Sequence, residues 1–204
     1  MHKAAYEGDR TAIALLIARG AHVNAHGGYY GSALQAACHK GNTDIAKFIL
    51  NHGADVDIQG GFHGTALQAA ALAGNQEIVG LLLEQGADVD LQGGFFGTAL
   101  QAACYKGHND MVEILIAMGA NVNLQGGYYG SALQAAAYSG NREVVEFLIQ
   151  KGAAVNARGG EFGSALRAAS ITGNREVVKV LITNGAEEAV SKWGYKNLLL
   201  WRPL

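Results

Sequence analysis

The sequence predicts an all-α solenoid in which 33-residue helix-turn-helix units stack side by side, each with a projecting hairpin loop. Near-identical stretches begin at Gly27, Gly60, Gly93, Gly126 and Gly159, so the period is 33 residues with no insertion. A strict period of this length is typical of stacked supersecondary units. Half of the residues are apolar and 16% are charged, which suits a continuous spine buried between neighbouring units.

The period also predicts the organisation of the chain, which we interpret as a single array over residues 1–204. Gly8 and Gly20 lie 33 residues before Gly41 and Gly53, so the array begins inside a unit. The expected divisions are a truncated unit at 1–26, full units at 27–59, 60–92, 93–125 and 126–158, a last unit at 159–190, and a degenerate cap at 191–204. The cap contains apolar residues that could shield the last unit: Trp193, Leu198, Leu200 and Trp201.

Each unit is expected to begin with a short, alanine-rich helix. A hydroxyl side chain occupies the expected N-cap of every copy, at Ser32, Thr65, Thr98, Ser131 and Ser164. An alanine recurs inside the helix, at Ala36, Ala69, Ala102, Ala135 and Ala168. Alanine on a contact face lets successive helices approach closely, and a larger side chain there would overpack the stack.

A second, amphipathic helix is expected after a glycine in each unit. Its expected N-caps are Asp9, Asn42, Asn75, His108, Asn141 and Asn174. In the 60–92 unit the apolar stripe includes Ile78, Val79 and Leu82. Gly86 then stands at the left-handed position that closes a helix, and an extended arm with a glycine turn leads to the next unit.

These signals together resemble a known family. The order G-T-A-L-Q-A-A…G-N…G-A-D-V-D, repeated at 33 residues from residue 1 to about 190, resembles the ankyrin repeat. The resemblance implies stacked helix pairs with hairpins, and a protein-binding function. The histidine of the family signature is replaced by Gln35, Gln68, Gln101, Gln134 and Arg167. Glutamine keeps a donor and an acceptor with which to tie the loop backbone.

The hairpins carry two glycines and then an aromatic pair, as in "GGYYGSALQAA" from Gly27. This pattern resembles the ankyrin arrays of fungal NLR-like proteins, which implies the recognition part of a larger or multicomponent system. The chain has no G-x-x-x-x-G-K-(S/T) motif that would supply an NTPase.

The sequence gives little support for catalysis, a cofactor or a metal. A glycine-rich turn before a helix attracts anions, so a nucleotide- or phosphate-binding module, or an enzyme using these loops, is the alternative hypothesis. However, no copy has the P-loop lysine. Cys38 and Cys104 lie two units apart, about 20 Å at ordinary helix spacings, which is too far for a disulfide. The histidines do not match metal-ligand spacing, so we expect no cofactor and two buried, reduced thiols.

Charge and hydropathy narrow the class of partner. The formal net charge is −2 and no run of Lys or Arg occurs, which argues against nucleic acid. No stretch approaches the roughly 18 apolar residues of a membrane span, and the opening "MHKAAYEGDR" is unlike a secretory signal. We therefore expect a monomer in the cytoplasm or nucleus, with an unidentified protein as its partner.

Two residue columns form the expected hairpin tips. The first column is Tyr29, Phe62, Phe95, Tyr128 and Glu161, and the second is Tyr30, His63, Phe96, Tyr129 and Phe162. Because burial would penalise an acid at Glu161, the first column is expected to be exposed and the second to pack hairpin against hairpin.

Late positions of the first helix vary between units that are otherwise alike, so packing does not fix them. The resemblance to ankyrin repeats implies that these positions, together with the first tip column, form a partner-binding face on the concave side of the array. Its expected residues, all projecting from the scaffold, are Tyr29, His39, Phe62, Leu72, Phe95, Tyr105, Lys106, Tyr128, Tyr138 and Ile171. Most of the affinity is expected in the middle units. A solvated face that binds nothing in particular is the alternative.

Overall fold

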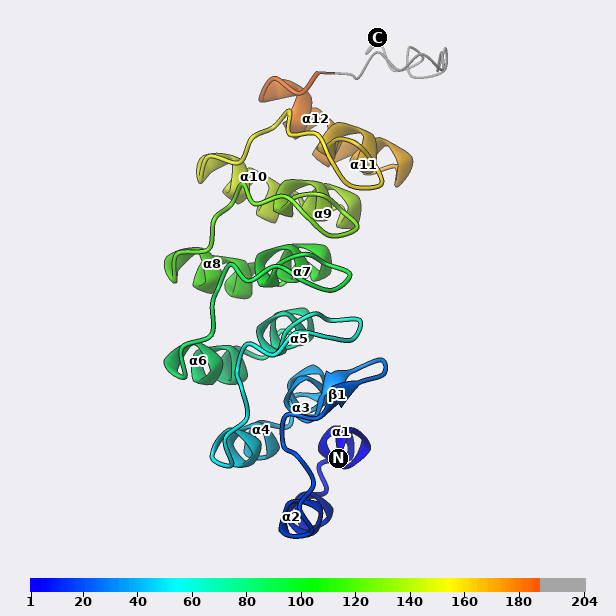
Figure 1. Ribbon diagram of the computed structural model, residues 1–204. Coiled ribbons are helices and arrows are strands. Elements are labelled where there is room, and N and C mark those ends of the chain that lie inside the picture. Colours follow the sequence, from blue (N-terminus) through cyan, green and yellow to red (C-terminus); the bar gives the residue numbers. More distant parts are fainter. Residues whose placement is uncertain (188–204) are drawn as a thin grey trace.

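The computed structural model describes residues 1–187, so the expected cap at 191–204 lies outside the described residues. Helix pairs stack in chain order into one elongated array, as the period predicts (Figure 1). The first helices of the pairs are α1 (His2–Glu7), α3 (Ala33–Lys40), α5 (Ala66–Ala73), α7 (Ala99–Lys106), α9 (Ala132–Ser139) and α11 (Ala165–Ile171). The second helices are α2 (Arg10–Ala18), α4 (Thr43–Leu50), α6 (Gln76–Glu84), α8 (Asn109–Ala117), α10 (Arg142–Gln150) and α12 (Arg175–Thr183). None of the described helices is long and apolar enough to cross a membrane.

The expected N-caps of the first helices are confirmed. In α3, α5, α7, α9 and α11, the Ser or Thr hydroxyl accepts a hydrogen bond from the backbone N–H three residues later. In α7 the side chain of Gln101 also accepts from the N–H of Thr98, which completes a capping box. These bonds fix where these five helices begin.

The expected N-cap positions of the second helices are confirmed, but only three of the six side chains bond their own helix. Asp9, Asn75 and Asn141 accept from a backbone N–H of their own helix. The other three N-cap side chains make no such bond: Asn42, His108 and Asn174.

These three side chains instead reach the preceding repeat. The Nδ2 of Asn42 donates to the carbonyls of Ala5 and Tyr6, each at 2.9 Å. Asn174 makes the equivalent bonds to Ala137 and Tyr138, at 3.3 and 3.2 Å. Helix ends leave such carbonyls without intrahelical partners, so these side chains link neighbouring repeats by satisfying them.

The spine runs through the first helices, which pack directly against one another in the order α1, α3, α5, α7, α9 and α11. The alanine column at its centre is fully buried from Ala36 to Ala168, as expected. Cys38 and Cys104 are buried and free, and burial raises the pKa of both thiols. The described cysteines therefore behave as small core residues.

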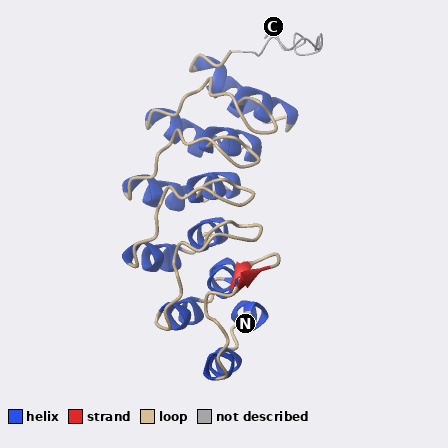
Figure 2. Cartoon of the chain, viewed as in Figure 1, coloured by secondary structure: helices blue, strands red, loops and turns tan. Residues whose placement is uncertain are grey.

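The hairpins project from the side of the array that carries the first helices (Figure 2). The first hairpin forms the antiparallel pair β1 (His26–Gly27) and β2 (Gly31–Ser32). The next four have a single bridge each, at Gly60–Gly64, Gly93–Gly97, Gly126–Gly130 and Gly159–Gly163. Hereafter, the inner side means the first helices and hairpins, and the outer side means the second helices and the loops that follow them.

Neighbouring hairpins are tied to each other by their backbones. The N–H of Phe62 donates to the carbonyl of Tyr29 at 2.7 Å, and the N–H of Phe95 donates to that of Phe62 at 2.8 Å. Tyr128 and Glu161 continue the series with bonds of 2.8 Å to the preceding tip. Each tip is therefore bonded to the residue 33 positions earlier.

This contact explains the second glycine of the hairpin. A Cβ added at Gly94 would lie 2.4 Å from the backbone nitrogen of Gly64, and the φ of Gly94 is +58°. Gly61, Gly127 and Gly160 stand in the same situation against the preceding hairpin. A side chain would clash with backbone there and would also strain the residue itself.

The glutamine column ties the first helices to the hairpins, as its chemistry predicts. The Nε2 of Gln35 donates to the carbonyl of Gly64 at 2.7 Å, and that of Gln68 donates to Gly97 at 2.9 Å. Gln101 bonds the carbonyl of Gly130 and Gln134 that of Gly159. Each of these glutamines therefore holds the hairpin of the next repeat.

Candidate protein-binding surface

Four aromatic rings stack along the hairpin tips. This tip row consists of Tyr29, Phe62, Phe95 and Tyr128, with centroid separations of 5.3, 4.9 and 4.8 Å and nearly parallel planes. The end rings are exposed, Tyr29 by 57% and Tyr128 by 40%. Glu161 follows the row and is exposed, as expected.

The expectation that these residues project freely from the scaffold is wrong for two of them. Phe62 and Phe95 are half-buried and contact the hydrophobic core. Each is covered by a tip ring on both faces. Parallel stacking places the rings one above the next, so the middle two present mainly their edges to solvent.

The second tip column lies beneath the tip row and is mostly buried. This buried row consists of Tyr30, His63, Phe96, Tyr129 and Phe162, of which Tyr30 alone is half-buried. The two rows meet edge to face, as in the Phe95–Phe96 pair, whose centroids are 5.1 Å apart at 83°. The expectation that the second tip column packs between the hairpins, which was based on Glu161 in the first column, is therefore confirmed.

The third row, or helix row, comes from late positions of the first helices: Tyr6, His39, Leu72, Tyr105, Tyr138 and Ile171. Tyr105 and Tyr138 are half-buried against the core, so the expectation that they project freely is wrong for them as well. Their rings flank Tyr129, with centroids 5.0 and 5.2 Å from its ring. Burial, followed by the neighbouring Tyr105, raises the pKa of Tyr129, so its hydroxyl stays neutral at physiological pH. Ile171 is 59% exposed.

Leu72 does not lie on the surface. The side chain is 7% exposed and belongs to the core, so the expectation that it projects is wrong. A branched aliphatic residue fills the space that tyrosine rings occupy in the repeats that follow. Its contribution to a surface is to support the aromatic residues around it.

A histidine pair interrupts the aromatic rows near the first hairpins. The rings of His39 and His63 stack with centroids 4.3 Å apart. His63 is 1% exposed, and neither of its nitrogens has a hydrogen-bond partner. Burial, and then the charge of His39, lowers the pKa of His63 to about 4. Burial, then Lys106 and Lys40, lowers the pKa of His39.

Sequence reasoning placed His63 in the packing column but missed its lack of polar partners. The pattern contained one signal, because the other members of that column are Tyr or Phe. A histidine in an aromatic column is buried among rings, which offer no lone pairs in the ring plane. Both histidines are therefore held neutral inside the surface.

Two lysines border the aromatic rows. The Nζ of Lys40 lies 5.2 Å from the centroid of the Tyr6 ring, and that of Lys106 lies 5.6 Å from the Tyr105 ring. Both side chains are exposed. Amines at this distance are attracted by the ring faces, which holds the two charges beside the surface.

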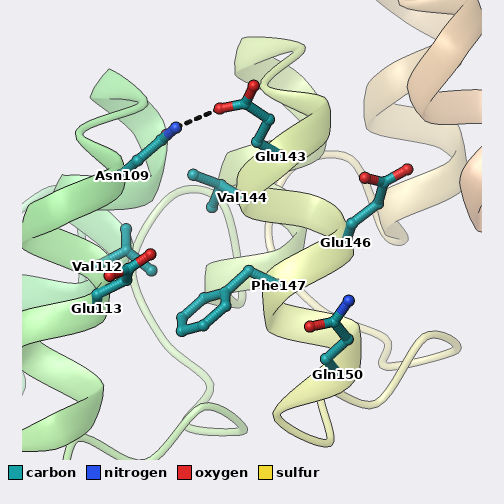
Figure 3. A pocket seen from close by; sticks show the side chains of 8 residues that line it. All are labelled: Asn109, Val112, Glu113, Glu143, Val144, Glu146, Phe147 and Gln150. Carbon is teal, nitrogen blue, oxygen red and sulfur yellow. Dashed lines mark hydrogen bonds between the residues drawn. The ribbon is translucent and has the colours of Figure 1, made fainter.

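Two hollows lie away from the aromatic rows. Figure 3 shows one of about 260 Å³ between α8 and α10, on the outer side. Asn109 donates to Glu143 across it at 2.6 Å, and Glu146 is paired with Arg142 at 2.8 Å. A second hollow of about 510 Å³ lies near the starts of α2, α4 and α6. Neither hollow is lined by the aromatic rows.

The glycine turns give no support to the phosphate hypothesis. The amides of Gly60, Gly93, Gly126 and Gly159 donate across their own hairpins. The amides of the tip row from Phe62 onward donate to the preceding hairpin. Within the described residues, no group of three or more His, Cys, Asp or Glu side chains is arranged to hold a metal ion.

Comparisons with known proteins agree with this architecture. A family model described as "Ankyrin repeats (3 copies)" matches residues 1–93 and 90–159. The crystal structure of the human ASB11 ankyrin repeat domain is similar, with a TM-score of 0.74 and 31% sequence identity. The match covers 91% of this chain and 83% of that one. No curated protein matches. The chain is a member of the ankyrin-repeat family, whose domains are generally protein–protein interaction modules.

Proposed function

We propose that the chain is a non-enzymatic scaffold that binds a protein partner through the aromatic surface of its inner side. The observation that carries this proposal is the continuity of the tip row, whose four rings stack across four successive hairpins and keep solvent-exposed edges. Aromatic residues dominate the energy of protein interfaces. Surfaces of this kind mark interaction sites when they are contiguous.

The proposed contact residues follow from exposure. Tyr29, Tyr128, Ile171 and Lys106 would contact the partner directly because their side chains are exposed. The half-buried members would contribute ring edges: His39, Phe62, Phe95, Tyr105 and Tyr138. Leu72 would not contact the partner and would only support the aromatic residues from the core. The array would work as a monomer inside the cell, as the recognition part of a larger or multicomponent system.

Paired variants test the proposal. The wild-type array and Tyr29→Ala/Tyr128→Ala would each be used to capture proteins from the source organism, with mass spectrometry to identify them. Met118→Ala is a matched control, since Met118 is 58% exposed and follows α8 on the outer side. We expect a partner whose capture is lost with the tyrosine double variant and retained with the control, because anchors typically contribute about 2 kcal/mol each.

Two results would contradict the proposal. One is a partner lost with Met118→Ala and retained with the tyrosine variant, which would move the interface to the outer side. The other is specific micromolar binding of ATP, GTP or inorganic phosphate in calorimetry, which would favour the glycine-loop hypothesis.

A further inference from the structure

Charge is divided unevenly between the two sides of the array. The inner segments of the four full repeats are 27–41, 60–74, 93–107 and 126–140. Their charged residues are Lys40 and Lys106, with no carboxylate among them. The acidic residues of the same repeats lie in the outer segments: Asp44, Asp55, Asp57, Glu77, Glu84, Asp88, Asp90, Asp110, Glu113, Glu143 and Glu146. The inner side of the four full repeats is therefore positive, although the protein as a whole is negative.

The exposed parts of the rings reinforce this polarity. An aromatic ring carries partial negative charge on its faces and partial positive charge at its edge. Phe62 and Phe95 have both faces covered by neighbouring rings, so they offer edges to a partner. The amines of Lys40 and Lys106 stand beside these rows. Ring edges and amines both favour a partner that brings negative charge.

The geometry points to a partner of defined chemistry, and this inference rests on the proposed function. We propose that the partner presents an extended, acidic segment of polypeptide, with apolar side chains at its centre and a carboxylate toward each end. The carboxylates pair with Lys40 and Lys106, and the apolar centre lies over the intervening repeat. That repeat offers Ala73 at the equivalent position, with no charge.

The spacing of the lysines sets the length of the segment. Lys40 and Lys106 occupy equivalent positions two repeats apart. At helix spacings of up to about 10 Å, the backbone positions of the two lysines are about 20 Å apart. An extended chain advances about 3.3 Å per residue, so the two carboxylates are about six residues apart in the segment.

A single-stranded nucleic acid is also negative, but it fits the surface less well. Bases bind such proteins by stacking on the faces of aromatic rings, in a groove rich in positive charge. Here the faces of Phe62 and Phe95 are already occupied by other rings. Two lysines in four inner segments also give little charge for a phosphate backbone.

The test uses a phage library of random 16-residue peptides, panned on three forms of the full chain. These are the wild type, Lys40→Glu/Lys106→Glu, and the control Lys151→Glu. The control is matched because the Nζ of Lys151 also lies over a ring, 5.2 Å from the Phe147 centroid, but on the outer side. Urea unfolding of each form checks that the substitutions leave the array folded, and Lys40→Met/Lys106→Met serves if the double reversal does not fold.

We expect the wild type and Lys151→Glu to enrich peptides with two acidic residues about six positions apart and apolar residues between them. Their affinity for Lys40→Glu/Lys106→Glu should fall by about tenfold or more, because two exposed pairs become repulsive. High salt should weaken binding to the wild type and have less effect on Lys40→Met/Lys106→Met.

Four results would overturn the inference. Enriched peptides without acidic residues, or peptides indifferent to the lysine reversal, would refute an acidic partner. If such peptides nevertheless fail to bind Tyr29→Ala/Tyr128→Ala, they use the aromatic surface. The proposed function then stands, and only the acidic character of the partner is refuted. No enrichment at all would refute a short linear segment and leave folded partners to the capture experiment. Tight binding of a fluorescent oligouridine to the wild type, lost on lysine reversal, would favour nucleic acid.

Discussion

The inner and outer sides of this array follow different rules. On the inner side, the stretch from the glycine pair through the first helix is nearly the same in each full repeat. Each of its elements contacts its own copies in the repeats before and after, as α5 does with α3 and α7. On the outer side the residues vary and carry most of the charge. Self-stacking, in which each residue must fit its own equivalent, explains the uniformity.

The comparison predicts the largest effect for a side chain added to the inner side. Gly94→Ala should destabilise the array by about 3 kcal/mol or more, because its Cβ would meet the preceding backbone and its φ is positive. Gly80→Ala is the outer counterpart, since Gly80 lies within α6 with nothing within 4 Å of an added Cβ. It should stabilise the protein by up to about 1 kcal/mol through helix propensity.

Urea unfolding of both variants measures the difference. A loss of unfolding free energy in Gly94→Ala and a gain in Gly80→Ala would support the contrast between the two sides. A Gly94→Ala protein as stable as the wild type would mean that the hairpins are free to separate.

The next effect concerns the alanine spine. Ala102 is fully buried where α7 packs between α5 and α9, so Ala102→Leu should overpack the stack and cost about 1–3 kcal/mol. An outer control is Glu113→Leu on α8, next to the hollow of Figure 3, where there is room for the side chain. A smaller loss for Ala102→Leu than for Glu113→Leu, measured by urea unfolding, would contradict a close-packed spine.

The histidine pair should make the inner side sensitive to acid. The pKa of His63 is about 4 in the folded protein, below its ordinary value of 6.5, so the unfolded chain binds the proton more readily. The free energy of unfolding should therefore fall as the pH falls from 6.5 toward 4, by up to about 1.4 kcal/mol per pH unit.

His63→Phe places in this repeat the residue that Phe96 supplies in the next one. It should flatten the dependence of stability on pH in that window, with a remainder from His39, whose pKa is also lowered. Chemical unfolding at a series of pH values gives the slope. An unchanged slope in His63→Phe would show that other groups cause the acid sensitivity.

The smallest expected effect lies in the loops of the outer side. Asn123 accepts a hydrogen bond from the N–H of Ala154 and donates one to the carbonyl of Gly152, and Asn24 and Asn156 make equivalent pairs. At the equivalent Asp57, the carboxylate accepts from the N–H of Asp88 but cannot donate. Burial, and the nearby charges of Asp88 and Asp55, raise the pKa of Asp57.

Asp57→Asn should therefore stabilise the protein by about 0.5–1.5 kcal/mol at neutral pH, the usual worth of one hydrogen bond. The gain should shrink at low pH, where the protonated carboxyl of the wild type can itself donate. The reciprocal change, Asn123→Asp, should destabilise by a similar amount. Equal signs for the two substitutions in thermal unfolding would refute the missing donor as the cause.

The features that recur at the same position of successive units could be predicted from the sequence. The hydroxyl caps, the alanine spine and the glutamine tethers follow from residue types at fixed positions, and Glu161 identified the exposed tip column. Two other contacts between units were not predicted. Asn42 serves the preceding helix rather than its own, and Leu72 lies beneath the aromatic rows. Both outcomes depend on how closely neighbouring repeats approach, which no pattern within one unit specifies.

The backbone bonds between hairpin tips also have a mechanical meaning. Together with the glutamine tethers, they form a chain of short, stiff links along the inner edge. The links across the outer edge are made by side chains instead, as where Asn109 donates to Glu143 between α8 and α10 and Lys47 pairs with Glu77 between α4 and α6. Side chains can change rotamer, so these links lengthen with less strain than the backbone bonds between the tips. Bending should therefore pivot about the inner edge and open or close the outer helices. The spacing between successive aromatic rings would stay constant during such motion. A bound partner would therefore meet the same ring spacing whether the array is straight or bent.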